Sequence, residues 1–454
     1  MTHPHSPENA RPLAARKSPA LTGQAQVPGD KSISQRALIL GALAEGQTRV
    51  TGLLESGDVH STAGALRGFG ATLTQEAPGR WLVTGTGVGQ WKSPAQPLDF
   101  GNSGTGSRLV MGAMATTPIT AVFTGDASLR SRPMARVVQP LEVFGIRYEG
   151  QGEKVLMPLT LHGAGGAQAA QVHVNTASAQ VKSALLLAAL NATGTTRIRQ
   201  DVLTRDHSEK MLKAFGADIE VTPLSEGGEV IALTGPARLT GCAIEVPSDP
   251  SSAAFPLVSA LIVPGSRVEL PGILLNPRRT GLIETLLEMG ADIAIENRRS
   301  SGGEEIGDLV VHHSTLKGVT VPASRSASMI DEYPILAVAA SFAVGETHML
   351  GLEELRVKES DRLAAVAAGL AANGVPHRIE GDDLIVQGLG PDSSSGGVPG
   401  GGTVTTHLDH RIAMAFLTMG LASQAPVTVD DVTMIATSFP EYMDLMKSLG
   451  AVFA

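Results

Sequence analysis

The stretch Pro28-Gly-Asp-Lys-Ser-Ile-Ser-Gln-Arg36 joins charged and hydroxyl side chains to the start of a helix that is too apolar to lie on the surface. From Ile33 onward, apolar residues recur at helical spacing, and further apolar residues cover the other sides. The N-terminus of such a buried helix keeps unpaired backbone N–H groups and the positive end of the helix dipole, which suit an anion. Lys31, Ser32 and Arg36 add side-chain donors at that end. An N-cap with surface charges is the alternative interpretation.

The chain repeats this arrangement. A helix-like run that ends in Gly and continues into a β-like stretch recurs at intervals of 71 to 84 residues. The glycine suits a helix C-cap in the left-handed region, because it has no Cβ to clash there. The six glycines are Gly70, Gly145, Gly216, Gly290, Gly374 and Gly450.

Each repeat also has an earlier, more apolar helix that opens with polar or charged residues. We expect these helices to begin at Ser32, Thr105, Ser178, Ser251, Ile330 and Asp409. The later helix is amphipathic, so one helix of each repeat is buried and the other covers it. Six such units predict an α/β fold with two domains of three units each, whose buried helices run parallel and direct their N-termini to a shared interdomain cleft. A single solenoid is the alternative, but solenoid repeats usually have about 20–50 residues.

Composition limits the class of protein. The 454 residues are 43% hydrophobic, which is enough for two or more cores. A net charge of −9 and 3% aromatic residues argue against a nucleic-acid-binding face. The single Cys242 excludes an intrachain disulfide and disfavours a structural zinc site, which fits a cytoplasmic protein. We also expect no cofactor. No apolar run is long enough to cross a bilayer, so we expect no membrane association.

Residues 1–20 lack the hydrophobic core of a signal peptide and predict a flexible tail, with a transit peptide as a weaker alternative. We assign residues 28–245 to an N-terminal lobe. Residues 21–27 and 246–454 form a C-terminal lobe in this prediction, and we expect a monomer.

Other helix starts carry candidate ligands. The Gly-rich run Gly101–Gly106 precedes a helix with Arg108 in its first turn and suits close approach of a phosphate or carboxylate. Arg132 precedes a Pro, and Thr204-Arg-Asp206 with Glu209 predicts a capping box preceded by a cation. A solvated charge at a helix end is the alternative for each arginine.

The stretch Arg356-Val-Lys-Glu-Ser-Asp-Arg362 places a cation in the first turn of a helix, where it opposes the dipole unless an anion binds. Asp331 and the segment Asp409-His-Arg411 each open or precede a very apolar helix. Together these cations predict small polyanionic substrates, with Asp331 and Glu359 available for proton transfer. The residues alone do not identify the substrates.

The chain resembles the 5-enolpyruvylshikimate-3-phosphate synthases over seven motifs that occur in the family's order from about Gly23 to the C-terminus. The motifs are PGDKSISQR, GNSGTGSR, SRPM, SAQVKSALL, IDEYPILA, RVKESDR and DHRIAMAF. The segments TRDHSEKM, NPRRTGLI and MIATSFPEYMDLM resemble the class II branch.

This resemblance implies a two-domain inverse α/β barrel of six βαβαββ-type units. It implies transfer of the enolpyruvyl group from phosphoenolpyruvate to the 5-hydroxyl of shikimate 3-phosphate, through a tetrahedral intermediate and without a metal. The pathway would be chorismate and aromatic amino acid biosynthesis. The implied catalytic residues are Lys31, Asp331 and Glu359. Shikimate 3-phosphate would contact Lys31, Ser32, Arg36, Ser178, Ala179, Gln180, Arg205, Asp331 and Lys358, and phosphoenolpyruvate would contact Lys31, Gly104, Arg132, Gln180, Arg362 and Arg411.

Three positions depart from common family patterns. Gln35 replaces a usual His, and Thr437 stands where many class I members have Lys. Gly104 occupies the position at which herbicide-tolerant class II members have Ala, so the resemblance implies inhibition by glyphosate.

Two other functions are considered. A UDP-N-acetylglucosamine enolpyruvyl transferase shares the architecture but uses a loop Cys, whereas Cys242 lies in a β-like stretch near the domain junction. A non-catalytic repeat scaffold predicts no phosphoenolpyruvate binding. The acidic balance disfavours an RNA phosphate cyclase.

Overall fold

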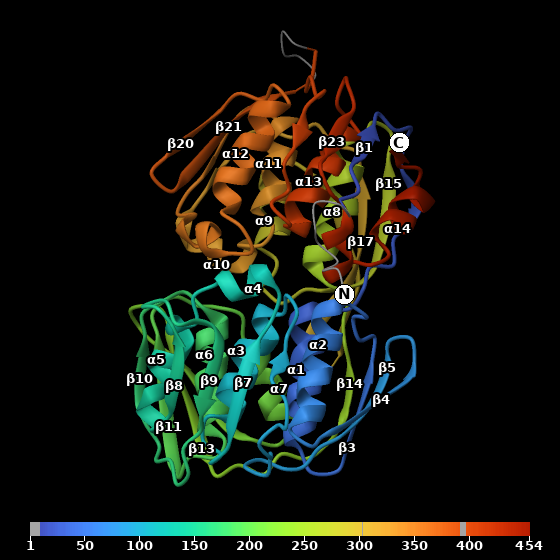
Figure 1. Cartoon of the computed structure of the whole chain (residues 1–454). Helices are drawn as coiled ribbons and strands as arrows, with labels where there is room; N and C mark the ends of the chain where they lie inside the picture. Colours follow the sequence, from blue (N-terminus) through green and yellow to red (C-terminus); the bar gives the residue numbers. More distant parts are fainter. Residues whose placement is uncertain (1–9, 302, 391–395) are drawn as a thin grey trace. The chain divides into compact units, whose positions relative to one another are not determined.

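The computed structural model describes residues 10–301, 303–390 and 396–454 and divides into two compact units. Unit 1 comprises the described part of Met1–Pro28, together with Pro247–Ser300 and Glu305–Ala454. Unit 2 comprises Gly29–Val246 and the hairpin tip Ser301–Glu304. Each unit contains three four-stranded sheets among the described residues (Figure 1).

The sheets of unit 2 have the strand orders β14-β3-β5-β4, β6-β7-β9-β8 and β10-β11-β13-β12. Its helices are α1 (Lys31–Leu43), α2 (Gly57–Gly68), α3 (Gly104–Met114), α4 (Ala127–Ser131), α5 (Ala135–Leu141), α6 (Ala179–Ala189) and α7 (His207–Ala214). Its strands are β3 (Gln47–Thr51), β4 (Thr72–Ala77), β5 (Arg80–Thr84), β6 (Leu98–Asp99), β7 (Thr120–Thr124), β8 (Arg147–Gln151), β9 (Leu156–His162), β10 (Gln171–Val174), β11 (Gly194–Gln200), β12 (Asp218–Pro223), β13 (Glu229–Gly235) and β14 (Ala243–Glu245).

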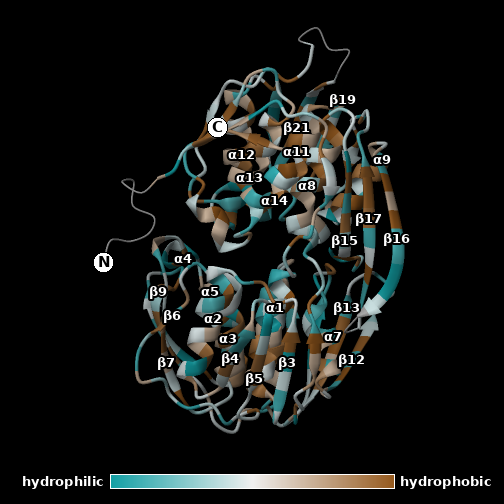
Figure 2. Ribbon diagram, turned by 90° about the vertical axis from the view of Figure 1, so that its right-hand side faces the viewer, coloured by the Kyte–Doolittle hydropathy of each residue, from teal (hydrophilic) through white to brown (hydrophobic). Residues whose placement is uncertain are grey.

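The sheets of unit 1 have the orders β16-β17-β15-β2, β18-β19-β21-β20 and β22-β23-β1-β24. Its helices are α8 (Pro250–Ile262), α9 (Gly281–Glu288), α10 (Ser326–Met329), α11 (Tyr333–Ser341), α12 (Arg362–Ala372), α13 (His410–Gly420) and α14 (Tyr442–Leu449). Its strands are β1 (Leu13–Arg16), β2 (Thr22–Gln24), β15 (Arg267–Leu274), β16 (Asp292–Ser301), β17 (Glu304–His312), β18 (Thr320–Val321), β19 (Val344–Met349), β20 (His377–Glu380), β21 (Asp383–Leu389), β22 (Thr403–Val404), β23 (Val427–Val429) and β24 (Val452–Phe453). Figure 2 shows β15, β16 and β17 side by side in this unit.

The most apolar helix of each repeat lies in the core of its unit, as predicted. In unit 2, α3 packs against both α1 and α6, and in unit 1 the helices α8, α11 and α13 pack against one another. Every residue of α8 is buried, as is every residue of α11 and α13. Such helices have no polar face, so their stability comes from tertiary packing.

The starts of these helices lie within a residue of prediction in five repeats. The fifth differs, because the short helix α10 precedes a turn at Ile330–Glu332, and α11 begins only at Tyr333. The Pro at position 334 occupies the first turn of α11, where its missing N–H costs no helical hydrogen bond. This turn places Asp331 outside the helix.

The six predicted C-cap glycines all have a left-handed backbone. Their φ angles lie between +71° at Gly374 and +108° at Gly450. Nothing lies within 4 Å of a Cβ built at Gly70, Gly216 or Gly290, so backbone conformation rather than space requires glycine there.

The strands β2 and β14 are each far in sequence from the strand with which they pair. Strand β2 precedes α1 of unit 2 in the chain but pairs parallel with β15 of unit 1. Conversely, β14 precedes α8 of unit 1 but pairs parallel with β3 of unit 2. The first repeat of each unit therefore receives its edge strand from a distant part of the sequence.

The flexible tail predicted for residues 1–20 is wrong for its second half. Strand β1 (Leu13–Arg16) pairs antiparallel with both β23 and β24, and Ala15 is fully buried. The short run Leu-Ala-Ala-Arg does not alternate between apolar and polar residues, so it gives no period-2 pattern that would indicate a central strand. Residues 1–9 lie outside the described residues.

The hairpin tip Ser301–Glu304 also departs from the prediction, which placed it in the C-terminal lobe. Within unit 2, Glu304 accepts hydrogen bonds from Lys210 at 2.7 Å and lies 2.8 Å from His207 Nδ1. These buried contacts explain why the tip groups with unit 2.

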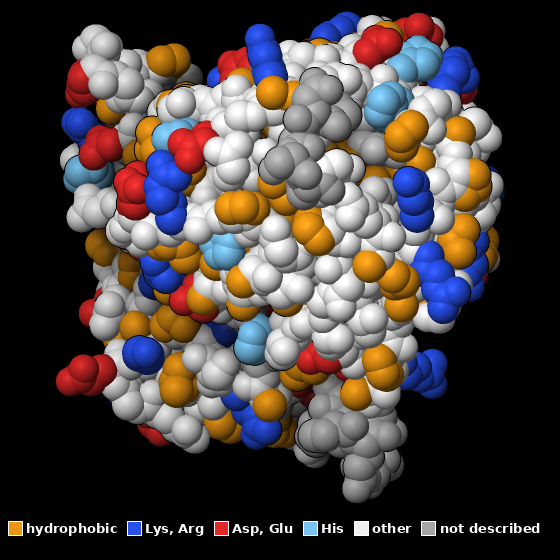
Figure 3. Space-filling model, turned by 90° about the horizontal axis from the view of Figure 1, so that it is seen from above, with side chains coloured by type: hydrophobic (Ala, Val, Ile, Leu, Met, Phe, Trp, Pro, Cys, Tyr) orange, Lys and Arg blue, Asp and Glu red, His pale blue; other side chains and the backbone are white. Residues whose placement is uncertain are grey.

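Among the described residues, no helix is both long and apolar enough to span a membrane. On the face seen in Figure 3, Lys and Arg side chains are interspersed with acidic, hydrophobic and neutral groups.

Candidate active site

The first turn of α1 holds its cations through short contacts within unit 2. Asp30 caps the helix by accepting a hydrogen bond from the Ile33 N–H at 2.8 Å. Lys31 Nζ lies 3.1 Å from Asp58 Oδ2 at the start of α2. Ser32 is half-buried beside it, in the same turn. The predicted anion-binding tip is therefore a capped helix start with an ammonium group fixed at its edge.

Arg36 is almost completely buried one turn further along α1. Its Nε donates to Ser208 Oγ at 2.8 Å, and its Nη2 donates to Ser183 Oγ at 2.9 Å. Its Nη1 donates to the Ser32 carbonyl at 3.1 Å. The guanidinium thus ties α1 to both α6 and α7.

The Gly-rich loop opens α3 as predicted. Ser103 is the N-cap and accepts a hydrogen bond from the Gly106 N–H at 3.2 Å. Arg132 Nη2 donates to Asn102 Oδ1 at 2.6 Å and to Ser128 Oγ at 3.1 Å. A Cβ built on Gly104 would lie only 2.8 Å from Arg132 Nη1, so this glycine lies directly beside the guanidinium.

The first turn of α6 carries Ser178, Ala179 and Gln180. Ser178 is the N-cap, and Ala179 is the first helical residue. Gln180 lies between two residues of α3: Arg108 Nη1 donates to its Oε1 at 2.6 Å, and its Nε2 donates to Thr105 Oγ1 at 2.9 Å. The amide orientation of Gln180 is therefore fixed by its neighbours.

The capping box predicted for α7 is absent. Arg205 lies just before the helix, but no side-chain hydrogen bond caps α7 at Asp206. Thr204 instead donates to Gln200 Oε1 at 2.9 Å. Glu209 points into the core, where its Oε1 lies 2.6 Å from Lys182 Nζ. Glu209 and Thr204 therefore contact Lys182 of α6 and Gln200 of β11 instead of capping α7. The spacing of residues in the sequence could not reveal these tertiary contacts.

The helix starts of unit 2 are joined by side-chain hydrogen bonds. Besides the contacts of Arg36 and Gln180, Gln35 Nε2 donates to Ser103 Oγ at 2.9 Å, which links α1 to α3. Gln35 therefore has a structural contact in this chain, where the family usually has His. We call Lys31, Ser32, Arg36, Gly104, Arg132, Ser178, Ala179, Gln180 and Arg205 the half-site of unit 2.

Unit 1 holds the remaining predicted residues around one buried guanidinium. Arg362 is 0% exposed and begins α12, as predicted. Its Nε lies 2.8 Å from Asp409 Oδ2, its Nη1 lies 3.0 Å from Asp331 Oδ1, and its Nη2 lies 2.6 Å from Glu359 Oε2. Burial opposes the charge, but the carboxylates of Asp409, Glu359 and Asp331 together raise the pKa of Arg362 above its usual value.

This cluster supplies the anions that a cation in the first turn of α12 requires. The carboxylates belong to the protein itself, a pairing that sequence reasoning missed, although Asp331 and Glu359 were singled out. Whether Arg362 also contacts phosphoenolpyruvate stays a prediction.

Asp409 organises a second cation of unit 1. It caps α13 by accepting a hydrogen bond from the Arg411 N–H at 2.9 Å. Arg411 Nη1 donates to the Asp331 carbonyl at 3.4 Å, and its Nη2 lies 4.0 Å from Asp331 Oδ2. Lys358 and Glu359 lie between the 3-10 helix η4 (Glu353–Val357) and α12. We call Asp331, Lys358, Glu359, Arg362 and Arg411 the half-site of unit 1.

A buried charged network next to Asp331 was not predicted. Ser251 Oγ donates to Glu332, and Arg279 Nη2 lies 3.0 Å from both Ser251 Oγ and Asp249 Oδ1. Arg279 is part of the segment NPRRTGLI, which served only as a family marker in the sequence. No local pattern shows that its charge is buried against the start of α8.

Asp206, His207 and Glu304 lie close enough to share a cation. However, Lys210 Nζ lies 2.7 Å from Glu304 Oε2 and 3.5 Å from Asp206 Oδ2. The ammonium group already neutralises these carboxylates, so the cluster has the arrangement of an ion-pair network. The prediction that the enzyme uses no metal is not tested by this cluster.

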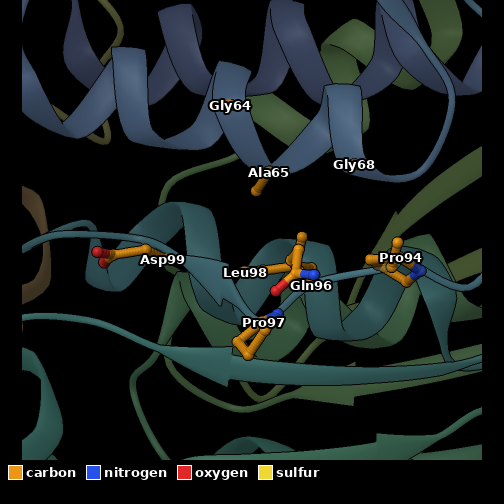
Figure 4. A pocket seen from close by; sticks show the side chains of 9 residues that line it. Gly64, Ala65, Gly68, Pro94, Gln96, Pro97, Leu98 and Asp99 are labelled. Atoms are coloured by element: carbon orange, nitrogen blue, oxygen red, sulfur yellow. The ribbon is translucent and has the colours of Figure 1, made fainter.

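Two further features lie apart from the half-sites. An open pocket of about 430 Å³ lies between Gly64, Ala65 and Gly68 of α2 and the segment Pro94–Asp99 (Figure 4). It contains none of the predicted site residues. Cys242 is half-buried just before β14, and burial raises the pKa of its thiol, which disfavours a nucleophilic thiolate.

Comparison with known proteins decides the family. The family model for EPSP synthase (3-phosphoshikimate 1-carboxyvinyltransferase) matches residues 15–446. The chain belongs to the EPSP synthase family. It is 58% identical over 454 residues to the 3-phosphoshikimate 1-carboxyvinyltransferase of Methylorubrum populi, covering 99% of this chain and 98% of the relative. The corresponding protein of Parvibaculum lavamentivorans is 58% identical over 450 residues, with the same coverage.

Solved structures agree with this assignment. EPSP synthase from Acinetobacter baumannii superposes with a TM-score of 0.85 at 41% identity, covering 98% of this chain and 99% of the other. The enolpyruvyl transferase NikO from Streptomyces tendae has a TM-score of 0.72 at 16% identity and shares the fold. The predicted fold class, family and enzyme class are therefore confirmed, as is the prediction of a transferase of the shikimate pathway.

Proposed function

We propose that the enzyme transfers the enolpyruvyl group of phosphoenolpyruvate to the 5-hydroxyl of shikimate 3-phosphate. The observation that carries this proposal is the arrangement of Asp331 and Glu359 on either side of the buried Arg362 guanidinium. Addition followed by elimination requires two proton transfers at different atoms of the substrates. Two carboxylates with one fixed cation between them suit that requirement.

We infer that the half-site of unit 2 binds most of the shikimate 3-phosphate. Its helix starts offer backbone N–H groups, hydroxyls and cations to a phosphate. We assign this substrate to Lys31, Ser32, Arg36, Ser178, Ala179, Gln180 and Arg205, with Asp331 and Lys358 contributed by unit 1.

Phosphoenolpyruvate requires cations at both its carboxylate and its phosphate. We assign it to Lys31, Gly104, Arg132, Gln180, Arg362 and Arg411. Gly104 has no side chain, and a Cβ there would lie 2.8 Å from Arg132 Nη1, so glycine keeps this side of the guanidinium open to an anion.

In this mechanism Asp331 accepts the proton of the 5-hydroxyl as its oxygen attacks C2 of phosphoenolpyruvate, and Glu359 donates a proton to the methylene carbon. In the second step Glu359 removes a proton from the resulting methyl group, the C–O bond to phosphate breaks and the double bond re-forms. The proton held by Asp331 goes to the departing phosphate. Lys31 stabilises negative charge on the substrates during both steps.

Phosphate release tests the proposal. Shikimate 3-phosphate is titrated first and phosphoenolpyruvate second, with UDP-N-acetylglucosamine as the alternative acceptor. We expect release only with shikimate 3-phosphate, and release with the sugar nucleotide alone would instead favour the related transferase. Lys31→Ala should abolish turnover, whereas a non-catalytic scaffold would tolerate it. We also propose that the enzyme acts as a monomer in the cytoplasm.

A further inference from the structure

Lys182 of α6 is a charged residue in the interior of unit 2. Its side chain is 0% exposed, and its Nζ lies 2.6 Å from Glu209 Oε1 of α7 and 4.0 Å from Glu229 Oε1 of β13. Gln200 Nε2 donates to Glu229, and Gln200 accepts a hydrogen bond from Thr204 at 2.9 Å. The ion pair therefore belongs to a buried polar network that reaches the segment carrying Arg205.

The stability of the fold does not explain why the Lys182–Glu209 ion pair is buried. Apart from Ser183, the other buried side chains of α6 are Val181 and the run Ala184–Ala189, so an apolar residue would suit the position of Lys182. Removing an ammonium and a carboxylate from water costs several kcal/mol per ion, and well-packed apolar replacements of a buried pair are often as stable or more stable. The pair needs a reason other than stability.

Its neighbours in the chain indicate that reason. Ser183 follows Lys182, and Ser208 precedes Glu209. Ser208 Oγ donates to Ser183 Oγ at 2.7 Å, and both hydroxyls accept hydrogen bonds from Arg36. The ion pair thus joins α6 to α7, and the neighbouring contacts of Ser183 and Ser208 with Arg36 join both helices to α1.

We propose that Lys182 and Glu209 are positioning residues for shikimate 3-phosphate. By fixing α7 against α6, they fix the two hydroxyls that orient the Arg36 guanidinium, and they fix the segment that carries Arg205 relative to Ser178 and Gln180. Neither residue is assigned a substrate contact. This inference rests on the proposed function, because it concerns the same substrate site.

The test uses a double variant, because Lys182→Met alone would leave a buried carboxylate without its cation and could prevent folding. Lys182→Met with Glu209→Gln removes both charges at similar volume. We expect this variant to fold, with its thermal midpoint close to that of the parent. The KM for shikimate 3-phosphate should rise about tenfold or more, since small misplacements of binding groups have effects of this size. The KM for phosphoenolpyruvate should change less than twofold.

A direct measurement separates binding from catalysis. Calorimetric titration with shikimate 3-phosphate alone should show the same loss of affinity in the double variant. Lys210→Met with Glu304→Gln is the matched control. Lys210 also lies on α7, but among the described residues its ion pairs are with Asp206 and Glu304, and neither residue belongs to α6 or α1. The control variant should leave both KM values unchanged.

Several results would overturn the inference. One is a folded Lys182→Met, Glu209→Gln variant whose KM for shikimate 3-phosphate is within twofold of the parent. The others are an equal rise in both KM values, an equal effect of the control variant, and failure of the Lys182→Met, Glu209→Gln variant to fold. If the parent enzyme itself released no phosphate from the two substrates, the proposed function would fail instead.

Discussion

Gly104 gives the most direct test of the phosphoenolpyruvate assignment. Gly104→Ala adds a methyl group whose carbon would lie 2.8 Å from Arg132 Nη1, whereas ordinary contacts begin at about 3.4 Å. The guanidinium must therefore withdraw by roughly half an ångström. It is held by Asn102 at 2.6 Å and Ser128 at 3.1 Å, so the shift also strains these hydrogen bonds.

The expected effect follows from what an anion loses at this position. A hydrogen bond to a charged group contributes about 1.5–3 kcal/mol, and each 1.4 kcal/mol is a factor of ten. We expect the inhibition constant of glyphosate to rise roughly tenfold to a hundredfold. The KM for phosphoenolpyruvate should also rise, because we assign the same Arg132 guanidinium to that substrate.

The assay is phosphate release at fixed shikimate 3-phosphate, with glyphosate varied against phosphoenolpyruvate. Gly64→Ala is the control, because Gly64 lies in the exposed part of α2 with nothing within 4 Å of a built Cβ. An unchanged inhibition constant for Gly104→Ala in a folded enzyme would contradict the assignment of this glycine to the anion site.

Three other variants test the fold and its charges. Arg362→Ala should lower the free energy of unfolding in urea by about 3–5 kcal/mol, because it leaves buried carboxylates without their cation. The control is Arg356→Ala, which removes a more exposed ion pair and should cost less than about 1 kcal/mol. Gly216→Ala should cost about 1–2 kcal/mol, since its φ of +91° strains any residue with a Cβ, and an unchanged thermal midpoint would show that the C-cap is not constrained. For Asp431, burial raises the pKa, but hydrogen bonds led by the Thr433 N–H lower it overall from 3.8. Asp431→Ala should therefore reduce thermal stability at pH 7, and the difference from the parent should shrink as the pH falls below 3.8 through the lowered pKa; a difference that persisted there would refute the charge-based explanation.

Periodic features of the fold were predictable from the sequence. The apolar helices and the glycines that end the amphipathic ones depend on residues a few positions apart, and Gly145 or Gly450 has its left-handed backbone for purely local reasons. The sequence placed residues 21–27 in the C-terminal lobe and residues 28–245 in the N-terminal lobe. The strands that β2 and β14 pair with were not predictable, because short strands pair with whatever edge tertiary structure brings near. The same limit applies to β1, whose partners follow it by more than 400 residues.

The candidate site divides in the same way. The motifs located Lys31, Asp331 and Arg362, but they did not show which of these charges form ion pairs with other side chains of the protein. Glu209 has the spacing of a helix cap and instead pairs with Lys182 across the core. A buried charge on an apolar helix, such as Lys182, was the available signal, since such a residue needs a partner from elsewhere in the chain.

The placement of β1 and β2 has a consequence for biosynthesis. Gly29–Val246 contains every strand of the three sheets of unit 2, so this unit can assemble while the ribosome is still translating. Strands β1 and β2 precede this unit in the chain, yet β2 pairs with β15 and Ala15 pairs with Phe453, which are both translated after it. These two strands therefore find their hydrogen-bonding partners only after the whole of Gly29–Val246 has been translated.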